Sequence, residues 1–213
     1  MKKPKFSKII AGTMSWGSWG RNFSATDMQR LVEKCVDLGV TSFDHADIYG
    51  GYTTESAFGT AFSKTAIVRS KVQFISKCGI QLVSPNRPNK IKHYDCSKAY
   101  IIASAESSLK HLKTDYLDAL LIHRPSPLMH PYEIVEAIQQ LKKDGKISSF
   151  GVSNFTPSQV DLISSEVAID INQIEFSAVQ HQALFNGSLD QLLKNKITPM
   201  AWAPLGAVFS SES

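Results

Sequence analysis

The sequence predicts an α/β fold in which a parallel sheet curls into an incomplete TIM-type (β/α)8 barrel. Along the 213 residues, short apolar runs alternate with longer helical patterns, which is typical of parallel strands joined by helical crossovers. About seven such units are present, and this number favours a barrel over an open sheet. No G-x-G-x-x-G follows the first apolar run, which weakens a dinucleotide-binding open sheet.

The predicted strands are short runs rich in β-branched and aromatic residues, without clean alternation of polar and apolar positions. Strands that are covered on both faces of a parallel sheet have this composition. The seven runs lie at residues 8–13, 40–46, 72–78, 118–124, 147–153, 169–176 and 199–205.

The predicted helices carry start and stop signals. Segment 24–39 begins at Ser24 and ends at Gly39, a good C-cap residue, and the helix expected within segment 130–146 has Gly145 just past its end. The apolar face of the first helix is expected to contain Leu31, Val32, Cys35 and Leu38. Further helices are expected at 54–63, 97–113, 157–165 and 187–195. The longest irregular segment, 79–96, is rich in turn residues, and a loop of this length is often a substrate lid.

The net charge of +4 is accounted for by four lysines near the N-terminus: Lys2, Lys3, Lys5 and Lys8. The remaining charges balance, so we expect a solvated chain start and no nucleic-acid or membrane partner. The apolar run after these lysines is too short for a secretory signal, and none reaches membrane-spanning length. We expect a cytoplasmic protein with a single domain over residues 1–213.

The cysteines and histidines give no sign of a disulfide framework or a metal site. The three cysteines, Cys35, Cys78 and Cys96, are odd in number and far apart. No C-x-x-C or H-x-x-x-H spacing occurs.

Polar residues stand at the end of most predicted strands. Asp44 ends the second strand and Tyr49 follows it, Lys77 ends the third, and His123 ends the fourth. Later strands contribute Ser153, Asn154, Asn172, Gln173 and Glu175. The carboxyl ends of barrel strands meet at one mouth, where barrel enzymes place their active sites. The sequence therefore predicts an active site built from residues that are distant along the chain.

Six motifs in this order carry a resemblance to a known family. They are FDHADIYGGY, FISKCG, LLIHRP, FGVSNF, NQIEFS and WAPLG. The chain resembles the aldo-keto reductases, and most closely a bacterial subgroup of oxidoreductases, over roughly residues 6–206. Each motif is weak by itself, whereas six at successive strand ends form a strong signal.

The resemblance implies four catalytic residues and no metal. Tyr49 matches the general acid, and Lys77 is expected to lower the pKa of this phenol from its ordinary value of about 10. Asp44 matches the residue that pairs with Lys77, and His123 matches the histidine that orients the substrate carbonyl. His45 and Asp47 are expected to support the loop without reacting.

The resemblance also implies an NADPH cofactor, with NADH as the alternative, and a small carbonyl substrate. Ser153, Asn154 and Gln173 match residues that bind the nicotinamide carboxamide, and Trp202 matches the aromatic residue that stacks on its ring, where many relatives have tyrosine. Trp16 is expected to wall the substrate pocket. Six further cofactor contacts are expected at Gly12, Thr13, Met14, Pro204, Leu205 and Gly206. Ala203 stands where many relatives have serine.

The resemblance ends before an eighth unit, although a barrel of this class has eight units and typically ~250 residues. In relatives the absent segment binds the adenosine 2′-phosphate, so we expect weak cofactor binding. The first and seventh strands should have open edges, which invite self-association. The first and last helices should expose apolar surface.

Two other functions remain open from the sequence. A non-catalytic nicotinamide-binding or regulatory protein could use the same scaffold. An unrelated barrel, such as an isomerase or aldolase, could use Lys77 as a Schiff-base nucleophile, although that chemistry does not need the motifs SNF and NQIEF.

Overall fold

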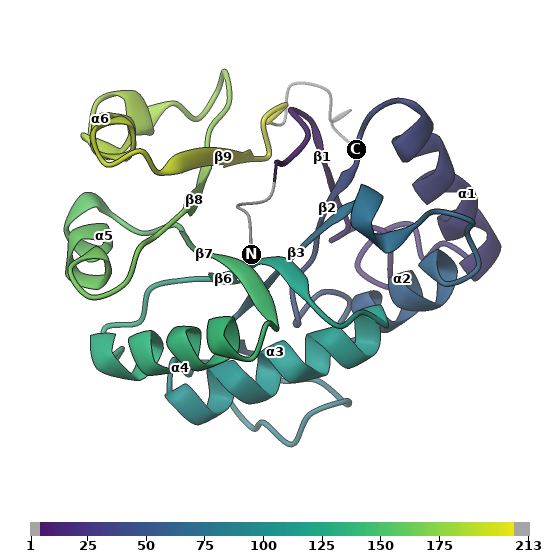
Figure 1. Cartoon of the computed structure of the whole chain (residues 1–213), viewed down its shortest axis with the longest axis horizontal. Coiled ribbons are helices and arrows are strands. Elements are labelled where there is room, and N and C mark those ends of the chain that lie inside the picture. The colour runs from purple at the N-terminus through teal and green to yellow at the C-terminus, as the bar shows by residue number, and fades with distance from the viewer. Residues whose placement is uncertain (1–4, 207–213) are drawn as a thin grey trace.

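The computed structural model describes residues 5–206 and contains a seven-stranded, all-parallel sheet (Figure 1). The strand order is β1-β2-β3-β6-β7-β8-β9. The strands are β1 (Ile10–Gly12), β2 (Ser42–Asp44), β3 (Gln73–Cys78), β6 (Leu117–Ile122), β7 (Ile147–Ser153), β8 (Ile171–Glu175) and β9 (Thr198–Trp202). Each lies within one of the seven predicted runs or differs from it by one residue.

Helices connect the strands and cover the outside of the sheet (Figure 1). They are α1 (Ala25–Asp37), α2 (Thr54–Phe62), α3 (Lys98–Leu112), α4 (Pro131–Lys143), α5 (Pro157–Ser164) and α6 (Ser188–Lys194), with short 3-10 turns at Arg69–Lys71 and Gln182–Leu184. The expected burial of Leu38 is wrong, because α1 ends at Asp37 and the capping Leu38 is 73% exposed. Met28 and Val32 are the buried residues of α1.

The sheet is curled, so that its first and last strands share one interior cluster. Ile75 of β3, Leu121 of β6, Ile171 of β8 and Met200 of β9 form this cluster, and Ile10 of β1 packs against it. Alternate residues point outward into a larger core that the helices complete. Lys77 lies two residues beyond Ile75 on the same interior face, at the carboxyl end of β3.

The barrel is incomplete in the described part of the chain. Within residues 5–206, β1 pairs only with β2, and β9 pairs only with β8. The expected fold class, an incomplete (β/α)8 barrel with seven strands, is confirmed.

The segment after β3 is more regular than expected. Residues 79–96 contain an antiparallel pair, β4 (Ile80–Gln81) and β5 (His93–Tyr94), and a further bridge joins Ser84 to Arg87. Strands of two residues leave no periodic signal in a sequence, which explains why this hairpin was expected to be irregular.

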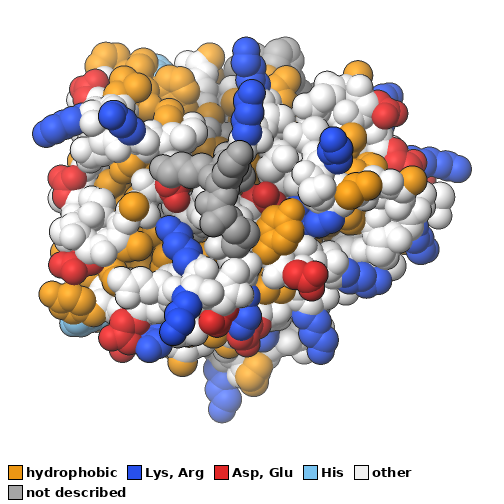
Figure 2. Space-filling view, viewed as in Figure 1, with side chains coloured by type: hydrophobic (Ala, Val, Ile, Leu, Met, Phe, Trp, Pro, Cys, Tyr) orange, Lys and Arg blue, Asp and Glu red, His pale blue; other side chains and the backbone are white. Residues whose placement is uncertain are grey.

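Neither the face shown in Figure 2 nor the described helices indicate a cationic binding surface or a membrane span. On the face in Figure 2, basic side chains are scattered among acidic ones. Among the described helices, none has the length and apolarity that crossing a membrane requires.

Candidate active site

Lys77 lies at the centre of the candidate site and is fully buried. Its Nζ donates to Asp44 Oδ2 at 2.8 Å, to the backbone oxygen of His45 at 2.8 Å and to the hydroxyl oxygen of Tyr49 at 2.9 Å. An ammonium has three donors, so all of them are used. The phenol oxygen accepts from Lys77, and within residues 5–206 its own proton has no hydrogen-bond acceptor. The proton of the Tyr49 hydroxyl is therefore not shared with another group of residues 5–206.

Strand register and one loop contact bring these groups together. Asp44 lies opposite Ile75 in the β2–β3 pairing, and Lys77 is two residues further along β3 on the same interior face. The backbone nitrogen of Asp47 donates to the backbone oxygen of Lys77 at 3.0 Å. This bond turns the loop after β2 back over the strand end, where the Tyr49 ring centroid lies 4.9 Å from the Lys77 ammonium.

The pKa shift of Tyr49 beside Lys77 differs from the sequence-based expectation. Burial raises the pKa of Tyr49 above its ordinary value, although Lys77 acts to lower it. The expected net decrease in the pKa of Tyr49 is therefore wrong, because the desolvation of the phenol outweighs the ammonium. Burial also acts to lower the pKa of Lys77, but Asp44 and Tyr49 outweigh it and the pKa is raised. Lys77 remains an ammonium.

His123 stands beside Tyr49 as a neutral imidazole. It directly follows β6, its backbone nitrogen donates to Cys78, and its ring centroid is 6.0 Å from that of Tyr49. Burial lowers the pKa of His123 well below its usual range, and Lys77 and Arg124 act in the same direction. A neutral imidazole has one N–H donor, which suits it to hydrogen-bond a carbonyl oxygen.

The ends of β7, β8 and β9 place a second set of polar groups beside His123. Asn154 links them, because its Nδ2 donates to Ser153 Oγ at 2.7 Å and its Oδ1 accepts from Trp202 Nε1 at 3.0 Å. Ser153 Oγ in turn donates to the backbone oxygen of Gln173 at 3.0 Å. Asn154 has φ +61°, a left-handed conformation that asparagine tolerates. Four of the residues expected to bind the cofactor therefore form one connected group.

The family model described as "Aldo/keto reductase family" matches residues 8–213. The chain belongs to the aldo/keto reductase family.

Curated relatives extend beyond the length of this chain. The uncharacterized oxidoreductase YcsN of Bacillus subtilis is 45% identical over 98% of this chain and 71% of its own length. A 6-dehydroglucose reductase of Agrobacterium fabrum is 37% identical over 96% of this chain and 69% of its own length. A solved structure, the glycerol dehydrogenase AKR11B4 from Gluconobacter oxydans, aligns with a TM-score of 0.82 and 26% identity, covering 92% of this chain and 59% of that protein. The present chain thus spans about two thirds of these aldo/keto reductases.

The three residues expected at the first-strand turn have different surroundings. Thr13 is buried, and its Oγ1 donates to the backbone oxygen of Asp44 at 3.0 Å and contacts His45 Nδ1 at 2.9 Å. Met14 is 53% exposed, and a Cβ on Gly12 would meet no atom within 4 Å. Thr13 is tied to the strand that carries Asp44, whereas Gly12 and Met14 leave open space beside it.

Pro204, Leu205 and Gly206 follow β9 at the edge of the described chain. All three are exposed, and Leu205 is 66% exposed. Gly206 has φ +56°, and a Cβ there would come within 2.6 Å of the Val179 side chain. This glycine is needed for the close approach of the segment after β9 to the segment after β8.

Trp16, which was expected to wall the substrate pocket, is buried, whereas its neighbour Trp19 is exposed. Trp16 is 8% exposed and packs in the outer core, with its ring centroid 6.3 Å from that of Phe43 and 6.2 Å from that of Phe58. Trp19 is 47% exposed, and its ring centroid lies 6.3 Å from that of Tyr49. The structure therefore brings Trp19, and not Trp16, against the phenol. Both tryptophans lie in one glycine-rich segment, so the sequence offered no basis for choosing between them.

His45 and Asp47 make contacts of a supporting kind. Burial lowers the pKa of His45 to about 3, with Lys77 and Arg69 acting in the same direction, so its buried ring is neutral. Asp47 Oδ2 accepts from Tyr100 at 3.0 Å and from Ser104 at 2.9 Å. These two bonds anchor the Tyr49 loop to α3.

Sequence reasoning missed two charged residues near the site. Glu55 is buried, and its Oε1 accepts from Ser76 Oγ at 2.6 Å, on the outer face of the strand that carries Lys77. Arg124 lies with its guanidinium 5.9 Å from the Trp202 ring centroid. A glutamate six residues after Tyr49, on a helix against a buried strand, was the signal available for Glu55.

The residues present fit the nicotinamide end of a cofactor. Amide donors and acceptors on Asn154 and Gln173 match a carboxamide. The amide nitrogen of Gln173 donates to the sulfur of Met200 at 3.1 Å, a weak acceptor that a stronger partner could replace. The indole of Trp202 supplies a flat face for stacking. Among residues 5–206, no cluster of histidine, cysteine and carboxylate side chains could hold a metal ion.

Proposed function

We propose that this protein reduces an aldehyde or ketone to an alcohol with NADPH, or with NADH as the alternative cofactor, and that Tyr49 is the general acid. The observation that carries the proposal is the hydrogen bond of 2.9 Å from the ammonium of Lys77 to the hydroxyl oxygen of Tyr49. This bond occupies a lone pair of the phenol oxygen and leaves its proton for a substrate. Membership of a family of oxidoreductases supports the same chemistry.

The chain's own residues account for the proton transfer. His123, as a neutral donor, holds the carbonyl oxygen next to Tyr49. As the carbonyl carbon is reduced, its oxygen becomes an alkoxide and takes the phenol proton. An alkoxide is far more basic than a phenolate, so the raised pKa of Tyr49 does not prevent the transfer. Lys77 stabilises the remaining phenolate, Asp44 keeps Lys77 charged, and solvent then returns a proton to Tyr49.

A reduced nicotinamide cofactor, when bound, supplies the hydride. Ser153, Asn154 and Gln173 are proposed to hold its carboxamide, and Trp202 its ring. Their mutual hydrogen bonds beside His123 support this assignment. The contacts expected from Gly12, Thr13 and Met14, and from Pro204, Leu205 and Gly206, remain proposals of the same kind.

Two aromatic and loop features are proposed to shape the substrate site. Trp19 replaces Trp16 as the wall, because Trp19 is exposed and contacts the Tyr49 ring. The segment 79–96 is proposed as the lid. It is tied to the catalytic loop because the backbone nitrogen of Leu82 donates to the Tyr52 hydroxyl at 2.8 Å.

The proposal is tested by following NADPH oxidation with 4-nitrobenzaldehyde and identifying the product. We expect stoichiometric formation of the alcohol. Binding of NADPH without turnover of any aldehyde or ketone would instead favour a non-catalytic nicotinamide-binding protein. A covalent adduct at Lys77 that borohydride traps would favour Schiff-base chemistry.

The cellular setting is also a proposal. The three cysteines are free and partly or wholly buried, which suits the cytoplasm. We propose that residues 1–213 act as one domain and that the open edges of β1 and β9 allow self-association. Sedimentation velocity over a range of protein concentrations should show a rising mean mass, and a constant monomer mass would contradict the proposed association.

A further inference from the structure

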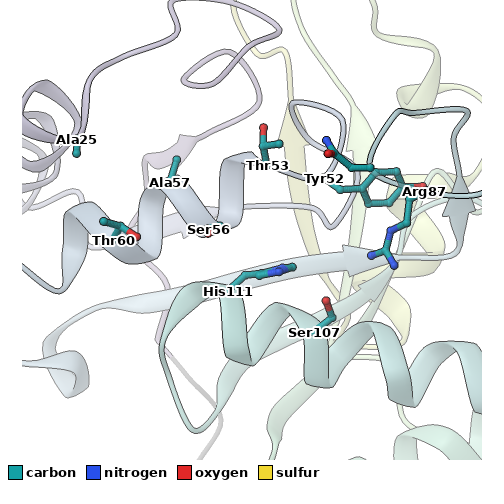
Figure 3. Close-up of a pocket in the computed structure, with 10 residues that line it drawn as sticks. Ala25, Tyr52, Thr53, Ser56, Ala57, Thr60, Arg87, Ser107 and His111 are labelled. Atoms are coloured by element: carbon teal, nitrogen blue, oxygen red, sulfur yellow. The ribbon is translucent and has the colours of Figure 1, made fainter.

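A polar groove lies on the outside of the barrel, between α2, α3 and the turn at residues 84–87 (Figure 3). It encloses about 730 Å³. Hydroxyl groups and three nitrogen-bearing side chains line it: Thr53, Ser56, Thr60, Ser107, Asn86, Arg87 and His111. No carboxylate is among the lining residues. The groove is therefore rich in hydrogen-bonding groups and carries the positive charge of Arg87 with no carboxylate in its lining. Outside the lining, Arg87 acts to lower the pKa of the buried Asp47.

Arg87 is the charged group of this groove. Its guanidinium lies 4.5 Å from the Tyr52 ring centroid, a cation–π arrangement that fixes its position. Among the described residues, no carboxylate forms an ion pair with it and no acceptor takes a hydrogen bond from its side chain. Five N–H donors in a planar fork match the oxygens of a phosphate.

The Tyr52 ring, which lies against the Arg87 guanidinium, is held in place by contacts with the backbone. Tyr52 has φ +73°, and its hydroxyl accepts from the backbone nitrogen of Leu82 at 2.8 Å. On the neighbouring turn, Asn86 Nδ2 donates to the backbone oxygen of Gly51 at 2.9 Å. The groove thus needs little rearrangement to receive a ligand.

His111 enters the groove from α3, on the side opposite Tyr52 (Figure 3). Burial lowers the pKa of His111, and Arg87 and Lys110 act in the same direction. An anion bound between Arg87 and His111 would offset the positive charges of Arg87 and Lys110 and so raise the pKa of His111. The protonation of this histidine is therefore a direct reporter of anion binding.

We propose that this groove binds a small phosphate monoester, with the phosphate paired to Arg87 and His111 and the polar remainder hydrogen-bonded to the hydroxyls of α2 and α3. The volume supports an ester over inorganic phosphate, since pockets of this size hold ligands of several heavy atoms beyond one anion. None of the residues that line the groove is among those proposed to act on the carbonyl or to hold the cofactor.

The test is an NMR titration of the purified protein with glycerol 3-phosphate, inorganic phosphate and glycerol, following the imidazole resonances of His111. We expect saturable binding of glycerol 3-phosphate with a Kd of about 1 mM, a higher pKa of His111 in the complex and weaker binding of the other two probes. Arg87→Gln should weaken binding by about tenfold, the factor expected for one charge-assisted hydrogen bond. The matched control Arg30→Gln removes an exposed arginine of α1 and should leave binding unchanged.

Three results would overturn the proposal. The first is the absence of a saturable shift at His111. The second is equal weakening by Arg87→Gln and Arg30→Gln, which would show unspecific ionic attraction. The third is glycerol or inorganic phosphate binding as tightly as the ester. Arg87 is exposed, so its substitution should not prevent folding, and His111→Gln provides a second variant that should also weaken binding.

Discussion

The two sides of the barrel mouth differ in the burial and hydrogen bonding of their side chains. On the β2–β3 side, Asp44, Lys77 and Tyr49 are all buried and are joined by hydrogen bonds of 2.8 and 2.9 Å. On the β8–β9 side, Trp202 is only half-buried, and the Gln173 amide nitrogen donates to a sulfur.

The surface beside the second side is correspondingly apolar. Phe185 is 79% exposed and Leu193 is 71% exposed. Figure 2 shows hydrophobic side chains gathered at the upper left, over α6. The proposed proton-delivering groups are thus held in place by buried hydrogen bonds within residues 5–206. The groups proposed to hold the cofactor make weaker contacts there.

The largest expected effect follows from breaking the buried ion pair. Lys77→Met leaves the Asp44 carboxylate without its cation and should lower the free energy of unfolding by about 3–5 kcal/mol. Urea denaturation measures this change. Lys71→Met, which removes an exposed lysine just before β3, is the matched control and should change stability little.

A double variant sharpens that prediction. Asp44→Asn combined with Lys77→Met removes both charges and should recover part of the stability lost in Lys77→Met, while activity stays absent. Additive losses of stability in the double variant would contradict a direct Asp44–Lys77 pairing.

The next effect concerns Glu55, on the same well-organised side. Burial raises the pKa of Glu55 from 4.5 to about 7, so the folded state binds a proton that the unfolded state releases. The associated stability is present below about pH 4.5 and is lost as pH rises through about 7. The loss should amount to roughly 3 kcal/mol.

The measurement is the free energy of unfolding across this pH range. Glu55→Gln should remove most of the pH-dependent loss, and Glu166→Gln, which alters an exposed glutamate, should retain it. Identical pH profiles for the protein and its Glu55→Gln variant would show that Glu55 does not titrate with a raised pKa.

The smallest expected effect is on the second side. Trp202→Ala should change the free energy of unfolding by less than about 1 kcal/mol, because the residue is only half-buried, yet it should raise the Kd for NADPH by about tenfold through loss of stacking. Fluorescence titration measures the Kd. Phe185→Ala, which removes an exposed aromatic residue in the same region, should leave it unchanged. Equal affinities in all three proteins would remove Trp202 from the proposed cofactor site.

The fold was largely predictable because each parallel strand leaves its own apolar run and each helix its own caps. The seven strands were found for this reason, and so was the left-handed Gly39 after α1. The β4–β5 hairpin escaped because its strands are two residues long. Leu38 was misplaced because spacing alone does not reveal where a helix ends.

The candidate site was predictable as a set of residues and less so as chemistry. Strand-end positions brought Asp44, Lys77 and His123 to one mouth together with Tyr49. The predicted direction of the Tyr49 pKa shift was wrong because the extent of burial of this residue cannot be read from the sequence. For the same reason, the burial of Trp16 and the exposure of Trp19 could not be predicted.

The most direct test of the central claim is the rate of NADPH-dependent carbonyl reduction in Tyr49→Phe against that in Tyr132→Phe. The first variant removes only the hydroxyl that accepts from Lys77, and the second removes the hydroxyl of an exposed tyrosine on α4. We predict a loss of about 10²- to 10⁴-fold in kcat for Tyr49→Phe, the usual contribution of a general acid, and an unchanged rate for Tyr132→Phe. Undiminished turnover in Tyr49→Phe would contradict the account.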